Sequence, residues 1–133
     1  MIRLQSIYKT PFGADTLYML LSERLSEESI SHKAMPSIEE HMAFVASQPY
    51  KAWYIVLDQD DVRVGATYLS KQNEIGIGIF KAHRGHGYGK RAVQMLMERH
   101  EGPFLANINP ANARSIAMFE SLGARHIQNT YAL

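Results

Sequence analysis

Alternating glycines mark the segment of this chain best suited to binding a charged ligand. Residues 84–91 read Arg-Gly-His-Gly-Tyr-Gly-Lys-Arg and join an apolar segment, residues 74–80, to a segment with helical periodicity. The first N–H groups of a helix have no partner within the helix, and its dipole adds positive potential there. The glycines leave these N–H groups uncovered, and the side chains of Arg84, Lys90 and Arg91 are basic. The turn is therefore predicted to bind a phosphate or pyrophosphate.

Two common phosphate-binding turns do not fit this segment. A P-loop follows the pattern G-x-x-x-x-G-K-[ST], but Arg84 occupies the first glycine position and Arg91 the hydroxyl position. The dinucleotide fingerprint has the spacing G-x-G-x-x-G at the first strand–helix turn, whereas the spacing here is G-x-G-x-G and lies past mid-chain. The glycine turn is therefore neither a P-loop nor a dinucleotide fingerprint, and it indicates another class of phosphate-binding protein.

Length and composition indicate one globular domain over residues 1–133, with 46% hydrophobic and 20% charged residues. The net charge of +1 argues against a nucleic-acid partner, because a protein that binds nucleic acid carries a basic face. The chain has no cysteine, so it has neither disulfides nor a thiol nucleophile. No apolar run approaches membrane-spanning length and residues 1–9 are polar, so we expect a cytoplasmic protein with no membrane partner.

Hydrophobic periodicity predicts an α+β fold with the order strand, helix, helix, three strands, helix, strand, helix, strand. Short turns join the three consecutive strands, which predicts an antiparallel meander. Ser37 and Glu40 form a capping box, and His41 is expected to be a satisfied core residue. The strands are expected at residues 2–8, 52–57, 62–69, 74–80, 104–107 and 124–131. The first two helices are expected from residue 13 to about 25 and from Ser37 to before Pro49. The last two are expected from the glycine turn to about His100 and from Asn109 or Asn112 to Gly123.

This order and two linked motifs resemble the GCN5-related N-acetyltransferase (GNAT) family. Arg84, Gly87 and Gly89 match its R/Q-x-x-G-x-G/A signature, and residues 105–115 with residues 119–124 resemble its A-x-x-x-x-x-N-x-x-S … E-x-L-G-F segment. That segment is typical of the branch that modifies ribosomal-protein N-termini and of related enzymes that act on amino sugars and small amines. The resemblance implies a mixed, mostly antiparallel sheet with helices on both faces, and acetyl-coenzyme A as co-substrate without a metal.

The resemblance also assigns residues to acetyl-coenzyme A. The pyrophosphate would bind the glycine turn, and the pantetheine arm would lie along residues 74–80. Gly76 and Gly78 leave one face of that strand bare, which is typical of close approach by a ligand but also of a bulge or a helix contact. Asn112 can bind the pantetheine arm or cap a helix. The implied cofactor-binding residues are Ile77, Ile79, Phe80, Arg84, Gly85, His86, Gly87, Tyr88, Gly89, Lys90, Asn112, Ser115 and Phe119.

Acetyl transfer to an amine needs a base and an oxyanion donor. Glu74 lies on the same side of its strand as Gly76 and is the first candidate base, although a solvated strand-end carboxylate fits equally well. His32 is a second candidate base or a substrate ligand. The N–H of Ile77 or Ile79 is the expected donor to the thioester oxygen. Phe119 stands where many relatives have a tyrosine that acts as general acid. The resemblance suggests that Ser115 binds the departing sulfur instead, and water or no acid at all remain alternatives.

The acceptor pocket is expected to include aromatic side chains. Trp53, Tyr54 and Tyr68 lie on predicted strands, where they can line a pocket or fill the core, and Asn107 is a further candidate substrate ligand. The expected activity is direct transfer in a ternary complex to a primary amine of a small molecule: an amino sugar, an amino acid or a polyamine. Acetylation of protein N-termini and non-catalytic sensing of acetyl-coenzyme A remain alternatives, and the protein is expected to be a monomer or homodimer.

Overall fold

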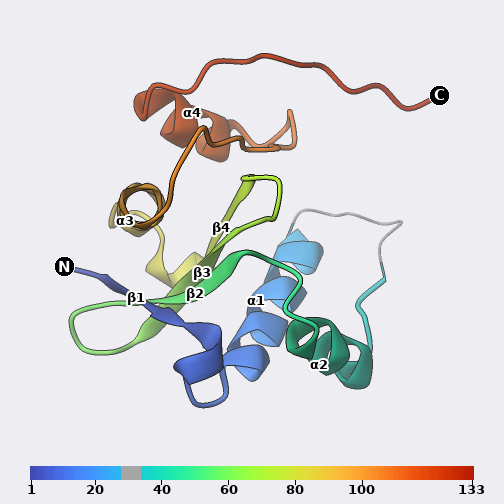
Figure 1. Ribbon diagram of the computed structural model, residues 1–133, viewed down its shortest axis with the longest axis vertical. Helices are drawn as coiled ribbons and strands as arrows, with labels where there is room; N and C mark the ends of the chain where they lie inside the picture. The colour runs from blue at the N-terminus through green and yellow to red at the C-terminus, as the bar shows by residue number, and fades with distance from the viewer. Residues whose placement is uncertain (28–33) are drawn as a thin grey trace.

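A computed structural model of the protein describes residues 1–27 and 34–133 (Figure 1). Its antiparallel sheet has the strand order β1-β2-β3-β4. Two short 3-10 turns, η1 (Ile7–Lys9) and η2 (Lys81–His83), follow β1 and β4. In chain order the strands and helices are β1 (Arg3–Ser6), α1 (Gly13–Glu27), α2 (Ile38–Ala46), β2 (Ala52–Leu57), β3 (Arg63–Leu69), β4 (Ile75–Ile79), α3 (Tyr88–Arg99) and α4 (Ala113–Ser121).

The sheet is covered on both faces because its strands alternate apolar side chains between them. Ile55 belongs to the apolar cluster that includes Leu17 of α1 and Val45 of α2. The next residue, Val56, belongs to a second cluster that includes Leu96 of α3 and residues of α4. Figure 1 shows α1 and α2 on one side of the sheet and α3 and α4 on the other. The predicted α+β fold, with helices on both faces of a mostly antiparallel sheet, is confirmed.

Local sequence signals set the helix starts. The Ser37 Oγ accepts a hydrogen bond from the Glu40 N–H at 3.1 Å, and the Glu40 carboxylate accepts one from the Ser37 N–H at 3.0 Å. These bonds form the predicted capping box and lower the pKa of Glu40. Asn112, rather than Asn109, caps α4, since its Oδ1 accepts the Ser115 N–H at 3.1 Å.

The buried residue His41 is satisfied as predicted. Its side chain is 5% exposed and lies under α1, where Nε2 is 2.8 Å from the carbonyl oxygen of Ala14. Its ring also lies 5.0 Å from that of Tyr18. A buried imidazole whose nitrogen meets a backbone carbonyl has its polar group satisfied.

Two predicted strands do not form as strands. In residues 104–107 the pairing is a single parallel bridge between Leu105 and Glu74, after which the chain leaves β4 toward α4. Residues 124–131 have no regular structure, and Ile127 and Tyr131 are 66% and 81% exposed. Both strand predictions are wrong: residues 104–107 leave β4 after one bridge, and residues 124–131 have no strand beside them in the described ranges. Strand-forming side chains make a strand only where the chain stays beside a pairing partner. Figure 1 shows the C-terminal segment running past α4, away from the sheet.

None of the helices in the described ranges is long and apolar enough to cross a lipid bilayer.

Candidate active site

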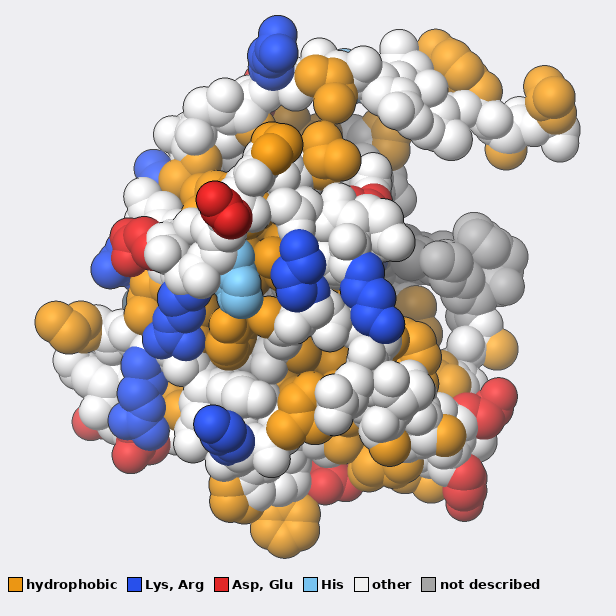
Figure 2. Space-filling view, in the orientation of Figure 1, with side chains coloured by type: hydrophobic (Ala, Val, Ile, Leu, Met, Phe, Trp, Pro, Cys, Tyr) orange, Lys and Arg blue, Asp and Glu red, His pale blue; other side chains and the backbone are white. Residues whose placement is uncertain are grey.

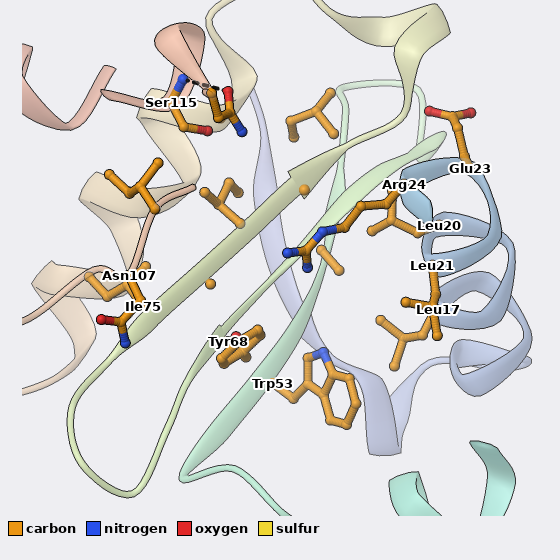
Figure 3. A pocket seen from close by; sticks show the side chains of 18 of the residues that line it. Leu17, Leu20, Leu21, Glu23, Arg24, Trp53, Tyr68, Ile75, Asn107 and Ser115 are labelled. Carbon is orange, nitrogen blue, oxygen red and sulfur yellow. Dashed lines mark hydrogen bonds between the residues drawn. The ribbon is translucent and has the colours of Figure 1, made fainter. Parts of the chain in front are cut away.

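A cavity of about 1010 Å³ follows the outer edge of β4. It reaches from α1 and α2, on one face of the sheet, to the start of α3 and to α4 on the other (Figure 3). The structure brings most of the predicted site residues together here. Those that line the cavity are Tyr68, Glu74, Ile77, Ile79, Arg84, Gly85, Gly87, Tyr88, Gly89, Lys90, Asn107, Asn112, Ser115 and Phe119.

The main chain of β4 turns its polar groups toward this cavity at alternate residues. The Phe80 N–H donates to Val64 on β3 at 2.9 Å, so even-numbered residues pair within the sheet. The Ile75 N–H points the opposite way and donates to the Leu105 carbonyl at 2.7 Å. By the same alternation, Ile77 and Ile79 direct their N–H and C=O groups outward, past the point where the Leu105 bridge ends. An extended ligand can therefore pair with β4 as a further strand would.

The glycine turn forms an open cradle at the start of α3. Gly85 and Gly87 have φ values of +86° and +76°, and an added Cβ at either would meet no atom within 4 Å. Gly87 is the N-cap of α3 and supplies no side-chain cap for the first N–H groups of the helix. Arg84 donates from Nε to the Ile79 carbonyl at 3.3 Å, which ties the turn to the end of β4. Figure 2 shows basic side chains spread over the face viewed, with apolar ones between them.

A carboxylate is fixed where Leu105 crosses β4. Asn107 donates from Nδ2 to one oxygen of Glu74, and the Ser70 hydroxyl donates to the other at 3.3 Å. The Ser70 hydroxyl also accepts the Glu74 N–H at 3.0 Å. Both Glu74 and Asn107 line the cavity, so the bridge that joins their segments places a held carboxylate inside it.

Four rings form an aromatic cluster at the α2 end of the cavity: Phe44, Tyr50, Trp53 and Tyr68. Tyr50 and Tyr68 are stacked, with centroids 4.0 Å apart and an interplanar angle of 9°. Tyr50 and Trp53 meet edge to face at 4.7 Å, and Phe44 lies 6.0 Å from Tyr50 and 6.1 Å from Trp53. Figure 3 shows Trp53 and Tyr68 side by side on the sheet.

The sequence did not single out Phe44 or Tyr50 as site residues. Phe44 lies on the apolar stripe of α2, and Tyr50 follows Pro49 in the loop before β2. The available signal was the spacing of aromatic residues at positions 50 and 53, next to a helix with an exposed Phe44. It does not reveal that Tyr68 of another strand completes the group.

Tyr68 also explains the glycine at position 76. A Cβ built on Gly76 would lie 2.0 Å from Cε2 of Tyr68, so the tyrosine ring occupies the space above that glycine. A Cβ on Gly78 would lie 3.3 Å from Leu20 of α1. Of the explanations that the sequence leaves open, contact with a helix describes Gly78, and the Tyr68 ring covers the face at Gly76. Both glycines also line the cavity.

Of the predicted site residues that the structure describes, three are not part of the lining. Tyr54 points to the opposite face of the sheet, where its hydroxyl is 2.7 Å from Nε2 of His100. Phe80, which precedes η2, and His86, which lies between Gly85 and Gly87, are outside the cavity lining. His32 lies outside the described residues.

The helix that carries Asn112, Ser115 and Phe119 closes the other side of the cavity. The Asn112 cap uses only the amide oxygen, so capping and a ligand contact through its nitrogen are compatible. Ser115 lines the cavity one turn into the helix. Phe119 is 7% exposed and belongs to the core cluster under α3 and α4, so it supplies a packing surface and no proton donor.

Burial raises the pKa of Tyr50 to about 12, with a further increase from the neighbouring Tyr68. Because the folded protein holds this proton more tightly than the unfolded chain does, stability is complete below about pH 10 and falls as the pH rises toward about 12. We expect Tyr50→Phe to reduce this alkaline loss of stability, measured by urea unfolding across that range. The exposed Tyr131→Phe is the matched control; an equal reduction in both variants would contradict the assignment.

A comparison with known protein families identifies the family to which this chain belongs. Residues 14–125 match the model of the acetyltransferase (GNAT) domain, and the chain belongs to that family. It is an acyltransferase, and its family uses acetyl-coenzyme A. The residues present fit that co-substrate, because an added Cβ at Gly85 or Gly87 would meet no atom within 4 Å, and the N–H groups of Ile77 and Ile79 point outward from the β4 edge. The described ranges contain no group of His, Cys, Asp or Glu that could hold a metal ion.

Solved structures share this fold at low sequence identity. A domain from Methanocaldococcus jannaschii DSM 2661 has a TM-score of 0.81 and 24% identity, over 98% of this chain and 92% of that one. The ribosomal-protein-alanine N-acetyltransferase from Brucella melitensis has a TM-score of 0.67 and 18% identity, over 92% and 83%. The Salmonella typhimurium protein yncA, in a structure with its cofactor acetyl-CoA, has a TM-score of 0.65 and 17% identity, over 92% and 78%. A comparison with curated protein sequences finds no match.

Proposed function

We propose that this protein transfers the acetyl group of acetyl-coenzyme A directly to a primary amine of a small molecule, with both substrates bound together. The observation that supports this proposal is that a single cavity contains both halves of the required site. The glycine cradle and the β4 edge lie at one part of it, and the held carboxylate of Glu74 and the aromatic cluster lie at the other.

The donor side uses backbone groups. Acetyl-coenzyme A supplies the acetyl group as a thioester. In this proposal the N–H groups from Gly85 to Gly89, with Lys90, bind its pyrophosphate. The outward main chain of Ile77 and Ile79 pairs with the pantetheine arm, and one of their N–H groups donates to the thioester oxygen as negative charge develops there.

The acceptor side uses Glu74 as the base. A primary amine arrives mostly as an ammonium ion at neutral pH and must lose a proton before it can attack. Glu74 takes that proton, directly or through a water molecule. The C–N bond then forms as the C–S bond breaks, the thiolate leaves with the electron pair of that bond, and the nitrogen releases its second proton to solvent to give the amide. Ser115 donates a hydrogen bond to the departing sulfur in this proposal, and the thiol regains its proton from solvent.

Kinetic order tests direct transfer. The chain has no cysteine to carry an acetyl group, so both substrates must be bound before the reaction. We expect initial rates, measured over a grid of both substrate concentrations, to give intersecting double-reciprocal lines. Parallel lines, or an acetylated protein trapped at low amine concentration and seen by mass spectrometry, would falsify direct transfer.

Ser115 and Phe119 lie one helical turn apart and have different expected roles. Ser115→Ala should lower turnover at saturating acetyl-coenzyme A by about tenfold, since it removes a hydrogen bond to a charged group. Phe119→Leu should keep most of the turnover, because it changes packing only. The measurement is kcat for both variants, with folding checked by circular dichroism. A larger loss of kcat at Phe119 than at Ser115 would reverse these roles.

Acetylation of a protein N-terminus is the second candidate function. The structural likeness to a ribosomal-protein-alanine N-acetyltransferase favours it. The two candidates differ in the acceptor, so short peptides with a free N-terminal alanine or serine belong in the same turnover experiment as small amines. Peptide turnover that exceeds that of every small amine would select the second function.

A further inference from the structure

The aromatic cluster lies beside the groups that would carry out the transfer. Tyr68 pairs in register with Gly76 of β4, one residue from Ile77 and two from Glu74. Trp53 pairs with Tyr68 on the next strand. A ligand that packs against these rings is therefore within a short chain length of the β4 edge and of the carboxylate. The cluster is part of the acceptor side of the cavity.

The wall opposite the cluster carries leucines and one arginine. Figure 3 shows Leu17, Leu20 and Leu21 reaching from α1 toward the side of the sheet that carries Trp53 and Tyr68, with the Arg24 guanidinium in the same space. The carboxylates nearby are bound: Glu40 is held in the capping box of α2, and Glu23 accepts the Lys81 N–H at 2.5 Å. The space between α1 and the rings therefore has mainly carbon on both sides, with one cationic group, Arg24, close enough to affect the pKa of Tyr50.

Such a recess discriminates among amines by their carbon skeleton. A polyamine would bring a further ammonium group close to the Arg24 guanidinium, which carries the same charge. An amino sugar would lose water from several hydroxyl groups against the leucines and the rings, and polar groups buried without partners are costly. A flat aromatic ring loses little hydration free energy there. It can stack on the rings or meet them edge to face, at the centroid separations of about 4.5–7 Å that aromatic pairs prefer. The walls thus favour an aromatic body over a polar one.

We propose that the acceptor is a primary amine joined by a short aliphatic chain to an aromatic ring, which packs between the aromatic cluster and the leucines of α1. This inference rests on the proposed function and narrows its substrate class. The ring anchors the acceptor, and the short chain carries its nitrogen to β4 and Glu74. Amino sugars and polyamines are then poor acceptors.

The only tryptophan of the chain, Trp53, lies in the cluster and reports on binding without any transfer. The test uses the full chain with 2-phenylethylamine as probe, and with putrescine and glucosamine as polar comparisons. We expect 2-phenylethylamine to change the tryptophan fluorescence saturably. We also expect its kcat/KM with acetyl-coenzyme A to be at least about tenfold above that of either polar amine. Equal or better turnover of the polar amines would overturn the proposal.

Two phenylalanines give a matched pair of variants. Phe44 lines the cavity and is 47% exposed, whereas Phe12 lies outside the lining and is 78% exposed, so neither truncation removes a buried core side chain. Phe44→Ala should lower kcat/KM for 2-phenylethylamine by about tenfold relative to putrescine. Phe12→Ala should leave both values unchanged. No selective loss in folded Phe44→Ala would contradict a role for the cluster in binding the ring.

The two levels of the proposal fail separately. Turnover of polar amines or peptides without turnover of aromatic amines overturns the aromatic acceptor and leaves acetyl transfer standing. Saturable binding of 2-phenylethylamine at Trp53, without transfer to any amine, supports the aromatic site and contradicts the proposed function.

Discussion

Replacing Gly87 with valine is expected to weaken the binding of acetyl-coenzyme A by about 100-fold, since each lost hydrogen bond to a charged group costs about 1.5–3 kcal/mol. Gly87 has a φ of +76° and caps α3 with open space above its backbone. A branched side chain there would stand in the cradle and block the N–H groups that face it. Isothermal titration calorimetry of acetyl-coenzyme A with both proteins measures the change.

Gly123→Val is the matched control for this variant. Gly123 also has a positive φ, +93°, with no atom within 4 Å of an added Cβ, but it lies outside the β4 cavity. Both variants therefore carry similar backbone strain, about 1–2 kcal/mol, and only one alters the cradle. Unchanged affinity in a folded Gly87→Val protein, or an equal loss in Gly123→Val, would remove the cradle from the account of cofactor binding.

Glu74→Gln is expected to lower turnover at neutral pH by about 100-fold, the low end of the range for a positioned base. Glutamine keeps the shape of the side chain, and its amide oxygen can accept one of the two hydrogen bonds that Asn107 and Ser70 donate, but it cannot take up a proton. The loss should shrink as the pH rises, because more of the amine then arrives uncharged. The measurement is the pH dependence of kcat for both proteins.

Glu98→Gln provides the control, because Glu98 is an exposed carboxylate of α3 that pairs with Arg91 at 3.3 Å. It removes one negative charge outside the cavity and should leave the pH–rate profile unchanged. If the profile of Glu74→Gln also matched that of the parent, Glu74 would be a structural residue that ties residue 107 to β4, and the base would have to be sought elsewhere.

The parts of the site that the sequence predicts well depend on local chemistry. The glycine turn requires glycine where φ is positive, as at Gly85 and Gly87, so the residue types themselves reveal the backbone. The capping box of Ser37 and Glu40 is likewise satisfied within one helical turn. Such features need no knowledge of the rest of the fold.

The parts that the sequence does not predict depend on which face or partner a residue meets. Trp53 and Tyr54 are neighbours on β2, and alternation places them on opposite faces, but it does not say which face carries the cavity. Phe44 and Tyr68 are brought together only by the packing of α2 on the sheet. Residues 124–131 have the composition of a strand, yet the described chain gives them no pairing partner.

The central claim is that this chain moves an acetyl group from acetyl-coenzyme A to the nitrogen of a small primary amine. The most direct test is mass spectrometry of the amine after incubation with the purified protein and acetyl-coenzyme A, with 2-phenylethylamine, amino acids, putrescine, glucosamine and short peptides in separate reactions. We predict an N-acetylated small amine, formed in equal amount to free coenzyme A and absent without the protein. Binding of acetyl-coenzyme A with no acetylated small amine in any reaction would contradict the claim.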